Sequence, residues 1–213
     1  MLEVDAQQRY TNRTARVKKT FFYRTDNMRI IMGITGASGA LYALELLRHL
    51  SAGGHEVHTV VSDYGWKLLE HECGTGKEDI AALSSHLHDN ANLAASIASG
   101  SFRAEAMVIV PCSMRTLAAV ATGLADTLIC RAADVMLKER KNLILAVRET
   151  PLSAVHLENM LKLARLGAGI MPLCPAFYHH PQSIAELATA LAGRIMDNLN
   201  LANEVCKRWQ GTA

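Results

Sequence analysis

Short apolar segments alternate with longer amphipathic ones along most of the chain, and this alternation constrains the fold more than any other feature of the sequence. Apolar strands of about four to eight residues separated by amphipathic helices form parallel sheets covered on both faces. We therefore predict an α/β fold in three layers, a Rossmann-like (flavodoxin-like) parallel sheet flanked by helices on both faces. The strands are expected at 29–35, 56–62, 106–113, 143–147 and 168–171, and the helices at 40–54, up to 72, at 114–122, 126–140, 152–167 and 183–199.

The 213 residues are enough for one compact domain with a complete core. Residues 1–27 hold six Lys or Arg and three Asp or Glu, although the whole chain has a formal net charge of only +2. A basic arm of this kind can contact nucleic acid or acidic lipid, but it is more often a solvated leader. We therefore expect an N-terminal extension over 1–27, a single domain over 28–213, and no nucleic-acid partner.

The sequence also indicates in which cellular compartment the protein acts. No apolar run approaches the roughly 18 residues of a membrane span, and the start has no secretory core, so we expect no membrane partner. The five cysteines are odd in number and form no CxxC, which favours reduced thiols and a cytoplasmic location. The nine histidines lack zinc-type spacing, and neither His86-x-His88 nor His179-His180 comes with a cysteine or carboxylate set, so we expect no metal.

The glycine turn "GITGASG" joins the first strand to the first helix. Glycines let the backbone approach a phosphate closely, and the start of the next helix offers free N–H groups. The spacing of Gly33, Gly36 and Gly39 is GxxGxxG rather than the GxGxxG of dinucleotide folds. Asp63 after the second strand leaves a nicotinamide cofactor open as a weak alternative, and tight packing is the other reading of the glycines.

Hydroxyl and charged side chains follow other strands at the edge where ligands bind in such sheets. In "PCSMRT", Ser113 and Thr116 bracket a helix start, either as plain N-caps or as groups that face a ligand. Arg131 and Lys138 share a face of one helix with Asp134, which is either a surface ion-pair ladder or part of an anion site. With Arg148 and Arg194, the cations would suit a phosphate-bearing substrate.

Seven motifs in order resemble the flavin prenyltransferases, the UbiX-like family, in the branch that accompanies aromatic-acid decarboxylases. They are "GITGASGA", "VVS" with Glu72 ten residues on, "PCSMRTLA", "RAADVMLKER", "RETPLS-x-x-HLENML", "PAFYHHPQS" and "RWQG", and they cover about residues 28–211. The helix "DYGWKLLEHE" departs from many relatives, which carry small residues near Tyr64 and Trp66. The resemblance implies that residues 28–213 form a flavoprotein domain.

The resemblance implies a prenyltransferase that joins the dimethylallyl group of dimethylallyl phosphate to N5 and C6 of reduced FMN. The product, prenylated FMN, would serve a UbiD-like decarboxylase. No metal is implied. Matched residue by residue, the resemblance assigns FMN binding to Gly36, Ala37, Ser38, Ser62, Ser113, Met114, Arg115, Thr116 and Arg148. It assigns prenyl-phosphate binding to Arg131, Tyr178, Arg194 and Trp209, and catalysis to Glu72, Lys138 and Glu149.

The resemblance also implies a homo-oligomer, typically a dodecamer, whose subunits share the prenyl-phosphate residues. The apolar, proline-rich loop "MPLCPAFYHHPQS" at 171–183 favours such a subunit contact. Two alternatives stay open from the sequence. One is an FMN-dependent oxidative cysteine decarboxylase of the same superfamily, although those enzymes typically read "PASANT" where this chain has "PCSMRT". The other is a non-catalytic protein that delivers flavin.

Overall fold

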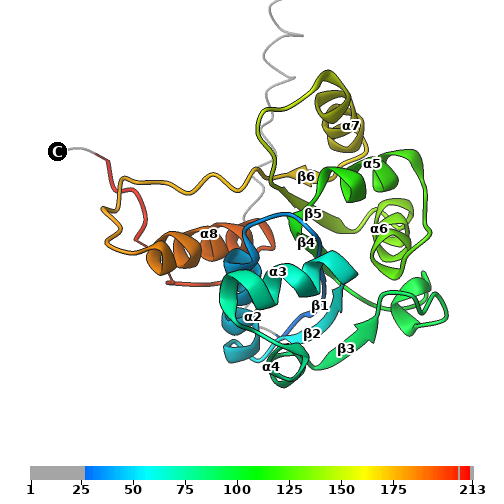
Figure 1. The fold of residues 1–213 in the computed structure, drawn as a ribbon, viewed down its shortest axis with the longest axis horizontal. Coiled ribbons are helices and arrows are strands. Elements are labelled where there is room, and N and C mark those ends of the chain that lie inside the picture. The colour runs from blue at the N-terminus through cyan, green and yellow to red at the C-terminus, as the bar shows by residue number, and fades with distance from the viewer. Residues whose placement is uncertain (1–26, 206, 212–213) are drawn as a thin grey trace, which may run out of the picture.

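A computed structural model describes residues 27–205 and 207–211, and its centre is a sheet of six parallel strands (Figure 1). The strands lie in the order β3-β2-β1-β4-β5-β6, and every neighbouring pair runs parallel. Their bounds are β1 Arg29–Ile34, β2 Glu56–Val61, β3 His86–Asp89, β4 Ala106–Cys112, β5 Asn142–Val147 and β6 Gly169–Ile170. This 3-2-1-4-5-6 order reverses direction between β1 and β4, and ligands of such sheets bind in the crevice at this switch point.

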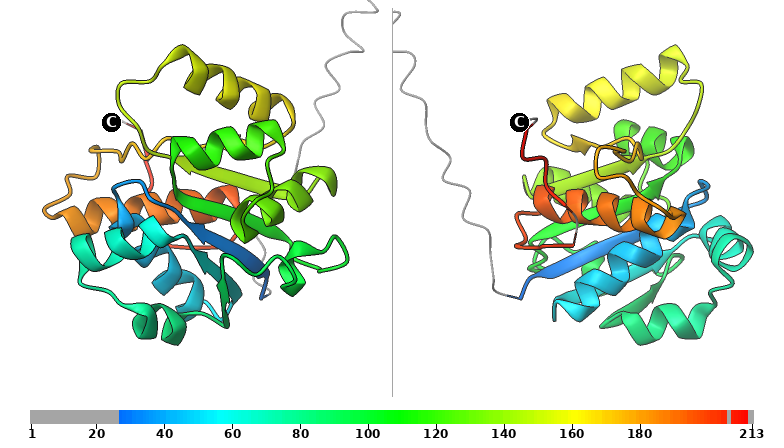
Figure 2. Two further views of the ribbon diagram at one scale, coloured as in Figure 1. Left: turned by 45° about the vertical axis from the view of Figure 1, so that its right-hand side comes forward. Right: turned by 90° about the vertical axis from the view of Figure 1, so that its left-hand side faces the viewer.

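Helices cover both faces of the sheet, which Figure 2 shows from two sides. On one face, α2, α4 and α8 pack with Leu69 of α3 against side chains such as Ile30 and Met32. On the other, α5, α6 and α7 pack against the alternate side chains of the same strands, such as Ile31 and Met107. The helices are α2 Ala40–Ala52, α3 Asp63–Cys73, α4 Lys77–Leu83, α5 Met114–Thr122, α6 Leu128–Lys138, α7 Ala154–Arg165 and α8 Ile184–Asn198, with a short 3-10 turn, η2, at Ser96–Ala98.

The three-layer parallel fold predicted from the sequence is confirmed. The sequence analysis missed α4 and the edge strand β3, however. The sequence of β3 is "HLHD", which has one apolar residue and no alternation of apolar with polar side chains. An edge strand packs on fewer neighbours than a central one, so its sequence carries a weaker apolar signal. The domain boundary before Met28 stays a prediction, because residues 1–26 lie outside the described part.

The loop predicted as a subunit contact leaves the sheet after β6 and extends away from it before the chain turns into α8 (Figure 1). Large apolar side chains are exposed on and near it: Phe177 is 68% exposed and Ile184 75%. Within the described residues, no helix is long and apolar enough to cross a membrane.

Candidate functional site

The crevice between β1 and β4 is held by one buried hydroxyl. Thr35 follows β1, is 2% exposed, and donates from Oγ1 to the carbonyl oxygen of Pro111 over 2.7 Å. Thr35 Oγ1 also accepts from the backbone N–H of Ser113 over 2.8 Å. Both bonds span the switch point, so the glycine turn after β1 and the start of α5 after β4 are fixed relative to each other.

Two hydroxyl-capped helices begin at this edge. Ser62 caps α3 by accepting from the N–H of Gly65 at 3.1 Å. Ser113 caps α5 by accepting from the N–H of Thr116 at 3.4 Å, and its own hydroxyl donates to Thr116 Oγ1. The first N–H groups of a helix have no partner inside the helix, so the start of α5 offers donors to an anion.

A cavity of about 550 Å³ opens between these helix starts. That volume falls within the range of small-molecule sites, roughly 300–1,000 Å³. A side chain at Gly36 would not fit, because its Cβ would lie 2.4 Å from the Cβ of Tyr64. The cavity is lined by Thr35, Gly36, Ser62, Asp63, Tyr64, Asn90, Ser113, Arg115, Thr116 and Thr127. Five of the nine residues predicted to bind FMN are therefore among its walls.

The start of α2 is occupied differently. Its N-cap Gly39 has a φ of 112°, a left-handed conformation that glycine adopts without strain. The carboxylate of Glu72, at the far end of α3, accepts from the N–H groups of Gly39 and Ala40 at 2.9 and 2.8 Å. The predicted catalytic acid thus lies where an anion would otherwise bind, next to Ser38 in the glycine turn.

These contacts determine the charge of Glu72. Partial burial by itself would raise the pKa of Glu72, but hydrogen bonds from Ser38, Gly39 and Ala40 outweigh burial, and the positive charge of Arg148 adds to them. The pKa is therefore lowered, and Glu72 is a carboxylate at neutral pH. Ser38, Glu72 and Arg148, which come from three separate parts of the chain, form one polar group.

Arg148 and Glu149 follow β5, next to β4 in the sheet. The backbone N–H of Arg148 donates to the carbonyl oxygen of Cys112 at 3.3 Å, and the side chains of both residues are exposed. Glu149 Oε1 accepts from the N–H of Thr150 at 2.9 Å. The predicted pair therefore lies at the ligand edge, where the charge of Arg148 acts on Glu72 and Glu149 accepts a hydrogen bond within its own turn.

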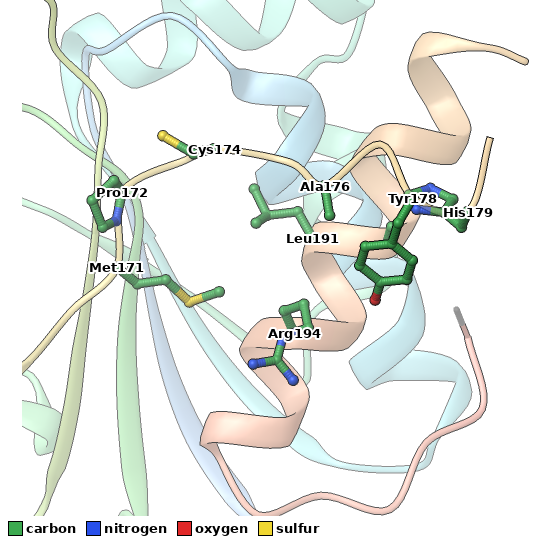
Figure 3. Close-up of a pocket in the computed structure, with 9 residues that line it drawn as sticks. Met171, Pro172, Cys174, Ala176, Tyr178, His179, Leu191 and Arg194 are labelled. Carbon is green, nitrogen blue, oxygen red and sulfur yellow. The ribbon is translucent and has the colours of Figure 1, made fainter. Parts of the chain in front are cut away.

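A second, smaller cavity of about 160 Å³ lies between the loop after β6 and α8 (Figure 3). Tyr178 and Arg194, both predicted to bind the prenyl phosphate, line it together with apolar side chains such as Met171 and Leu191. Trp209 stands edge-on to Tyr178, with ring centroids 5.5 Å apart, but is not among the lining residues and is 59% exposed.

The other predicted phosphate ligands lie on the opposite face of the sheet. Arg131 and Lys138 belong to α6, whereas Arg194 belongs to α8, and these helices cover different faces. Lys138 is the last residue of α6, four residues before β5 begins, so it lies near the edge where strands start. Within one chain, the structure does not bring Lys138 and Arg194 together.

Each of these three cations is paired with a carboxylate, as the ion-pair alternative predicted for Arg131. Arg131 pairs with Asp134 at 2.7 Å and also donates to the carbonyl oxygen of Ala98. Lys138 pairs with Glu139, and Arg194 pairs with Asp197 at 2.9 Å. A bound phosphate would compete with these carboxylates for the cations.

Sequence reasoning missed three polar residues of the larger cavity: Thr35, Asn90 and Thr127. Asn90 follows the missed strand β3 and accepts from Leu128 N–H and, through its side chain, from Ile129 N–H, which holds the start of α6. Thr127 caps the same helix. A signal existed for Thr127, since a threonine before an apolar helical run is a common N-cap, but Asn90 needed the strand before it to be recognised.

The cavity lies at the switch point of a parallel sheet, beside helix starts whose N–H groups can bind an anion. This arrangement is typical of α/β proteins that bind nucleotides or flavins. Comparison with known proteins gives the family. The sequence model of the Flavoprotein family matches residues 22–208. Flavin prenyltransferases, most of them called UbiX-like, are more than 40% identical to the chain over 86% of its length. The chain therefore belongs to the flavin prenyltransferases of the Flavoprotein family.

Three relatives illustrate the likeness. The flavin prenyltransferase LpdB of Lactiplantibacillus plantarum is 48% identical over 86% of this chain and 98% of its own length. A probable UbiX-like flavin prenyltransferase of Bacillus subtilis is 44% identical over 86% of this chain and 90% of its own length. The crystal structure of AnUbiX, in complex with FMN and dimethylallyl pyrophosphate, is 42% identical, covers 88% of this chain and 100% of that chain, and superposes with a TM-score of 0.86.

Some more distant solved structures share the fold alone. An FMN-dependent cysteine decarboxylase of thioviridamide biosynthesis, TvaF, is 15% identical with a TM-score of 0.55. It covers 68% of this chain and 90% of its own. The chain is therefore far closer to the prenyltransferases than to this decarboxylase.

We expect Glu72→Gln to lower stability at neutral pH, because the charged hydrogen bonds to the start of α2 are weakened. The folded-state pKa of Glu72 lies below its ordinary value of 4.5, so the carboxylate stabilises the fold above that value. This contribution is lost as the pH falls through and below 4.5. The difference in Tm between wild type and Glu72→Gln should therefore shrink towards acid pH.

The matched control is Glu70→Gln, an exposed carboxylate on the same helix, which should leave Tm almost unchanged at neutral pH. A Tm difference for Glu72→Gln that is the same at pH 7 and at about pH 3.5 would contradict a charge-dependent role.

Proposed function

We propose that the protein is a flavin prenyltransferase that joins the dimethylallyl group of dimethylallyl phosphate to N5 and C6 of reduced FMN. The allylic C–O bond breaks and phosphate leaves as the prenyl group bonds to N5, which loses its proton. The prenyl double bond then gains a proton and bonds to C6, which loses its own proton. The protein must hold two phosphorylated substrates and handle the proton from N5. The observation that carries the proposal is the cavity at the switch point, with its free helix start and the Glu72 carboxylate beside it.

The helix starts suggest where FMN binds. Because Glu72 already accepts from the N–H groups of Gly39 and Ala40, the FMN phosphate goes to the start of α5, beside Ser113 and Thr116. Met114 and Arg115 contribute backbone N–H groups there, and Ser62 adds a hydroxyl from α3. The flavin ring then lies along the glycine turn, with Gly36, Ala37 and Ser38 against one side and Arg148 near its edge.

The prenyl phosphate requires fixed cations and donors, because charge develops on it as the C–O bond breaks. Arg194 and the Tyr178 hydroxyl line the smaller cavity and are suited to this role. Lys138 and Arg131 complete the anion site from another subunit, since the sheet separates them from Arg194 within one chain. Trp209, next to Tyr178, offers an aromatic face to the allyl cation.

The two carboxylates divide the proton transfers. Glu72 is ionised at neutral pH and contacts Ser38, which lies in the turn next to the flavin, so it accepts the proton that N5 loses. Glu149, exposed at the tip of β5, faces the reacting end and passes a proton to or from the leaving phosphate. None of these steps calls on a metal.

The prenylated FMN would be handed to a UbiD-like decarboxylase, and a cytoplasmic location suits this exchange. The four cysteines of the described part, Cys73, Cys112, Cys130 and Cys174, are free thiols, which agrees with a reducing compartment.

We expect the purified protein, incubated without oxygen with reduced FMN and dimethylallyl phosphate, to release a flavin heavier by one C5H8 unit. Mass spectrometry of the extracted flavin makes the measurement, and a parallel reaction with the pyrophosphate shows which donor is preferred. A flavin-delivery protein would bind FMN and return it unchanged. A cysteine decarboxylase would return the flavin without added mass and, in a separate reaction with oxidised FMN, would release CO2 from a cysteine-terminated peptide while the flavin is reduced. Either result would overturn the proposal.

We also propose that the protein is a closed homo-oligomer, a dodecamer, that builds its prenyl-phosphate site between subunits. Exposed apolar side chains support a contact: Phe177, Tyr178 and Ile184 along the loop and the start of α8, and Val155 and Leu161 on α7. A UbiX-like protein from Escherichia coli O157:H7, 44% identical with a TM-score of 0.84 over 86% of this chain and 100% of that chain, is described as dodecameric.

Shared sites predict complementation. Lys138→Ala and Arg194→Ala should each lower prenyl transfer roughly a hundred- to thousand-fold, the effect of losing one donor at a developing anion, while FMN binding persists. When the two inactive variants are dissociated, mixed equally and reassembled, about a quarter of the sites should receive both native residues and regain activity.

The control is each variant reassembled alone, which should stay inactive. Light scattering that shows an active monomer would contradict the oligomer. An oligomer without complementation would contradict only the shared site.

A further inference from the structure

Three histidines and a glutamate gather at the far end of β2, away from the flavin cavity. His58 on β2 pairs in register with His86 on β3, and His88 follows two residues later on the same side of that edge strand. Glu56, two residues before His58, points to the same face. β2 is six residues long, so Glu56 lies about 20 Å from Ser62 at the opposite edge of the sheet.

His58 is the buried centre of this cluster. It is 3% exposed, and both of its ring nitrogens are within hydrogen-bonding distance of a partner: Nε2 is 2.9 Å from Glu56 Oε1, and Nδ1 is 2.9 Å from His88 Nε2. The ring of His86 stacks on it at 4.6 Å, and the ring of Phe102 packs edge-on at 4.9 Å. The ring of His58 is thus fixed in orientation before any ligand binds.

One ligand atom each from Glu56, His58 and His86 lies within 4.8 Å of the other two. Ligands of a tetrahedral Zn²⁺ are separated by about 3.3 Å, given bonds of about 2.0–2.1 Å. His86 is exposed, so its side chain can rotate to bring its ring nitrogen closer to Glu56 and His58 when an ion binds. Imidazole and carboxylate ligands together suit Zn²⁺ and similar transition-metal ions rather than Mg²⁺ or Ca²⁺.

We propose that Glu56, His58 and His86 form a transition-metal site, for which Zn²⁺ is the probe, that links β2 to the edge strand β3. The ion takes the position of the proton between His58 Nε2 and Glu56; neutral His58 then carries its single ring proton on Nδ1, neutral His88 carries its own on Nδ1, and no net proton is released. Nδ1–H of His58 then donates to His88 Nε2, the outer contact that orients a metal-bound histidine. Water completes the coordination.

Arg29 opposes the ion. Its Nε lies 2.8 Å from Glu56 Oε1, and its guanidinium stacks on Phe102 at 5.0 Å. Glu105, which accepts from the backbone N–H of Arg29, places a second negative charge nearby. The site therefore combines two carboxylates with one competing cation, and removing that cation should favour metal binding.

Spacing along the sequence could not show this site. Asp89 follows His86-x-His88 directly, but Glu56 and His58 come from the neighbouring strand about 30 residues earlier, so only the pairing of β2 with β3 brings them to His86. The site lies at the opposite end of β2 from the flavin cavity, and no step of the proposed prenyl transfer uses it. Its effect is on the stability of the sheet edge, because an ion that binds only the folded chain stabilises it.

Isothermal titration of the full-length, tag-free protein with Zn²⁺ tests the proposal, with Mg²⁺ as the comparison ion. We expect one Zn²⁺ per chain, a rise in Tm with Zn²⁺ and none with Mg²⁺. His86→Gln should abolish this binding, and His88→Gln, which removes only the outer contact, should weaken it about tenfold. Arg29→Gln should tighten it.

His180→Gln is the matched control, because it breaks the other histidine pair of the chain and should leave Zn²⁺ binding unchanged. Circular dichroism of each variant checks that the fold is retained. Zn²⁺ binding that survives His86→Gln but is lost in His180→Gln would overturn the proposal, as would no binding at all by the native protein. Weaker binding by Arg29→Gln would place the ion elsewhere.

Discussion

The hydroxyl of Thr35 joins the two strands between which the order of the sheet reverses, and the candidate site depends on this link. One buried oxygen donates to the carbonyl of Pro111 and accepts from the N–H of Ser113. The end of β1 and the end of β4 thereby stay in register beyond their last paired residues. Since the glycine turn follows one strand and α5 follows the other, the walls of the larger cavity are fixed by the sheet itself.

The starts of α2 and α5, which both lie at this crevice, have different roles. The start of α2 is satisfied within the protein by Glu72, whereas the start of α5 is capped by Ser113 and opens onto the cavity. A carboxylate that satisfies one helix start also keeps that start from holding a phosphate. The same contacts keep Glu72 ionised. Under the proposed function, one arrangement would therefore both direct the FMN phosphate to α5 and leave a base next to the flavin.

Much of the fold was predictable because buried parallel strands are apolar and carry their own signal, as in "LILAV" of β5. The edge strand β3 was not predictable, since half of "HLHD" is histidine. Because β3 was missed, Asn90 and the histidine cluster were missed too. At the site, position after the strands predicted Ser62 and Ser113 at the ligand edge, and the family resemblance added Glu72. The spacing on one helix anticipated the pair of Arg131 with Asp134 as one alternative. The pairs of Lys138 with Glu139 and of Arg194 with Asp197 were not predicted, because sequence does not show which acid a long side chain reaches. Nor does it show that the sheet lies between Lys138 and Arg194.

A crystal structure of the protein with FMN bound tests the central claim most directly, because the claim concerns which helix start holds the phosphate. The account predicts the FMN phosphate beside Ser113 and Thr116 at the start of α5, with Glu72 still bound to the N–H groups of Gly39 and Ala40. A phosphate at the start of α2, with the Glu72 carboxylate displaced, would contradict it.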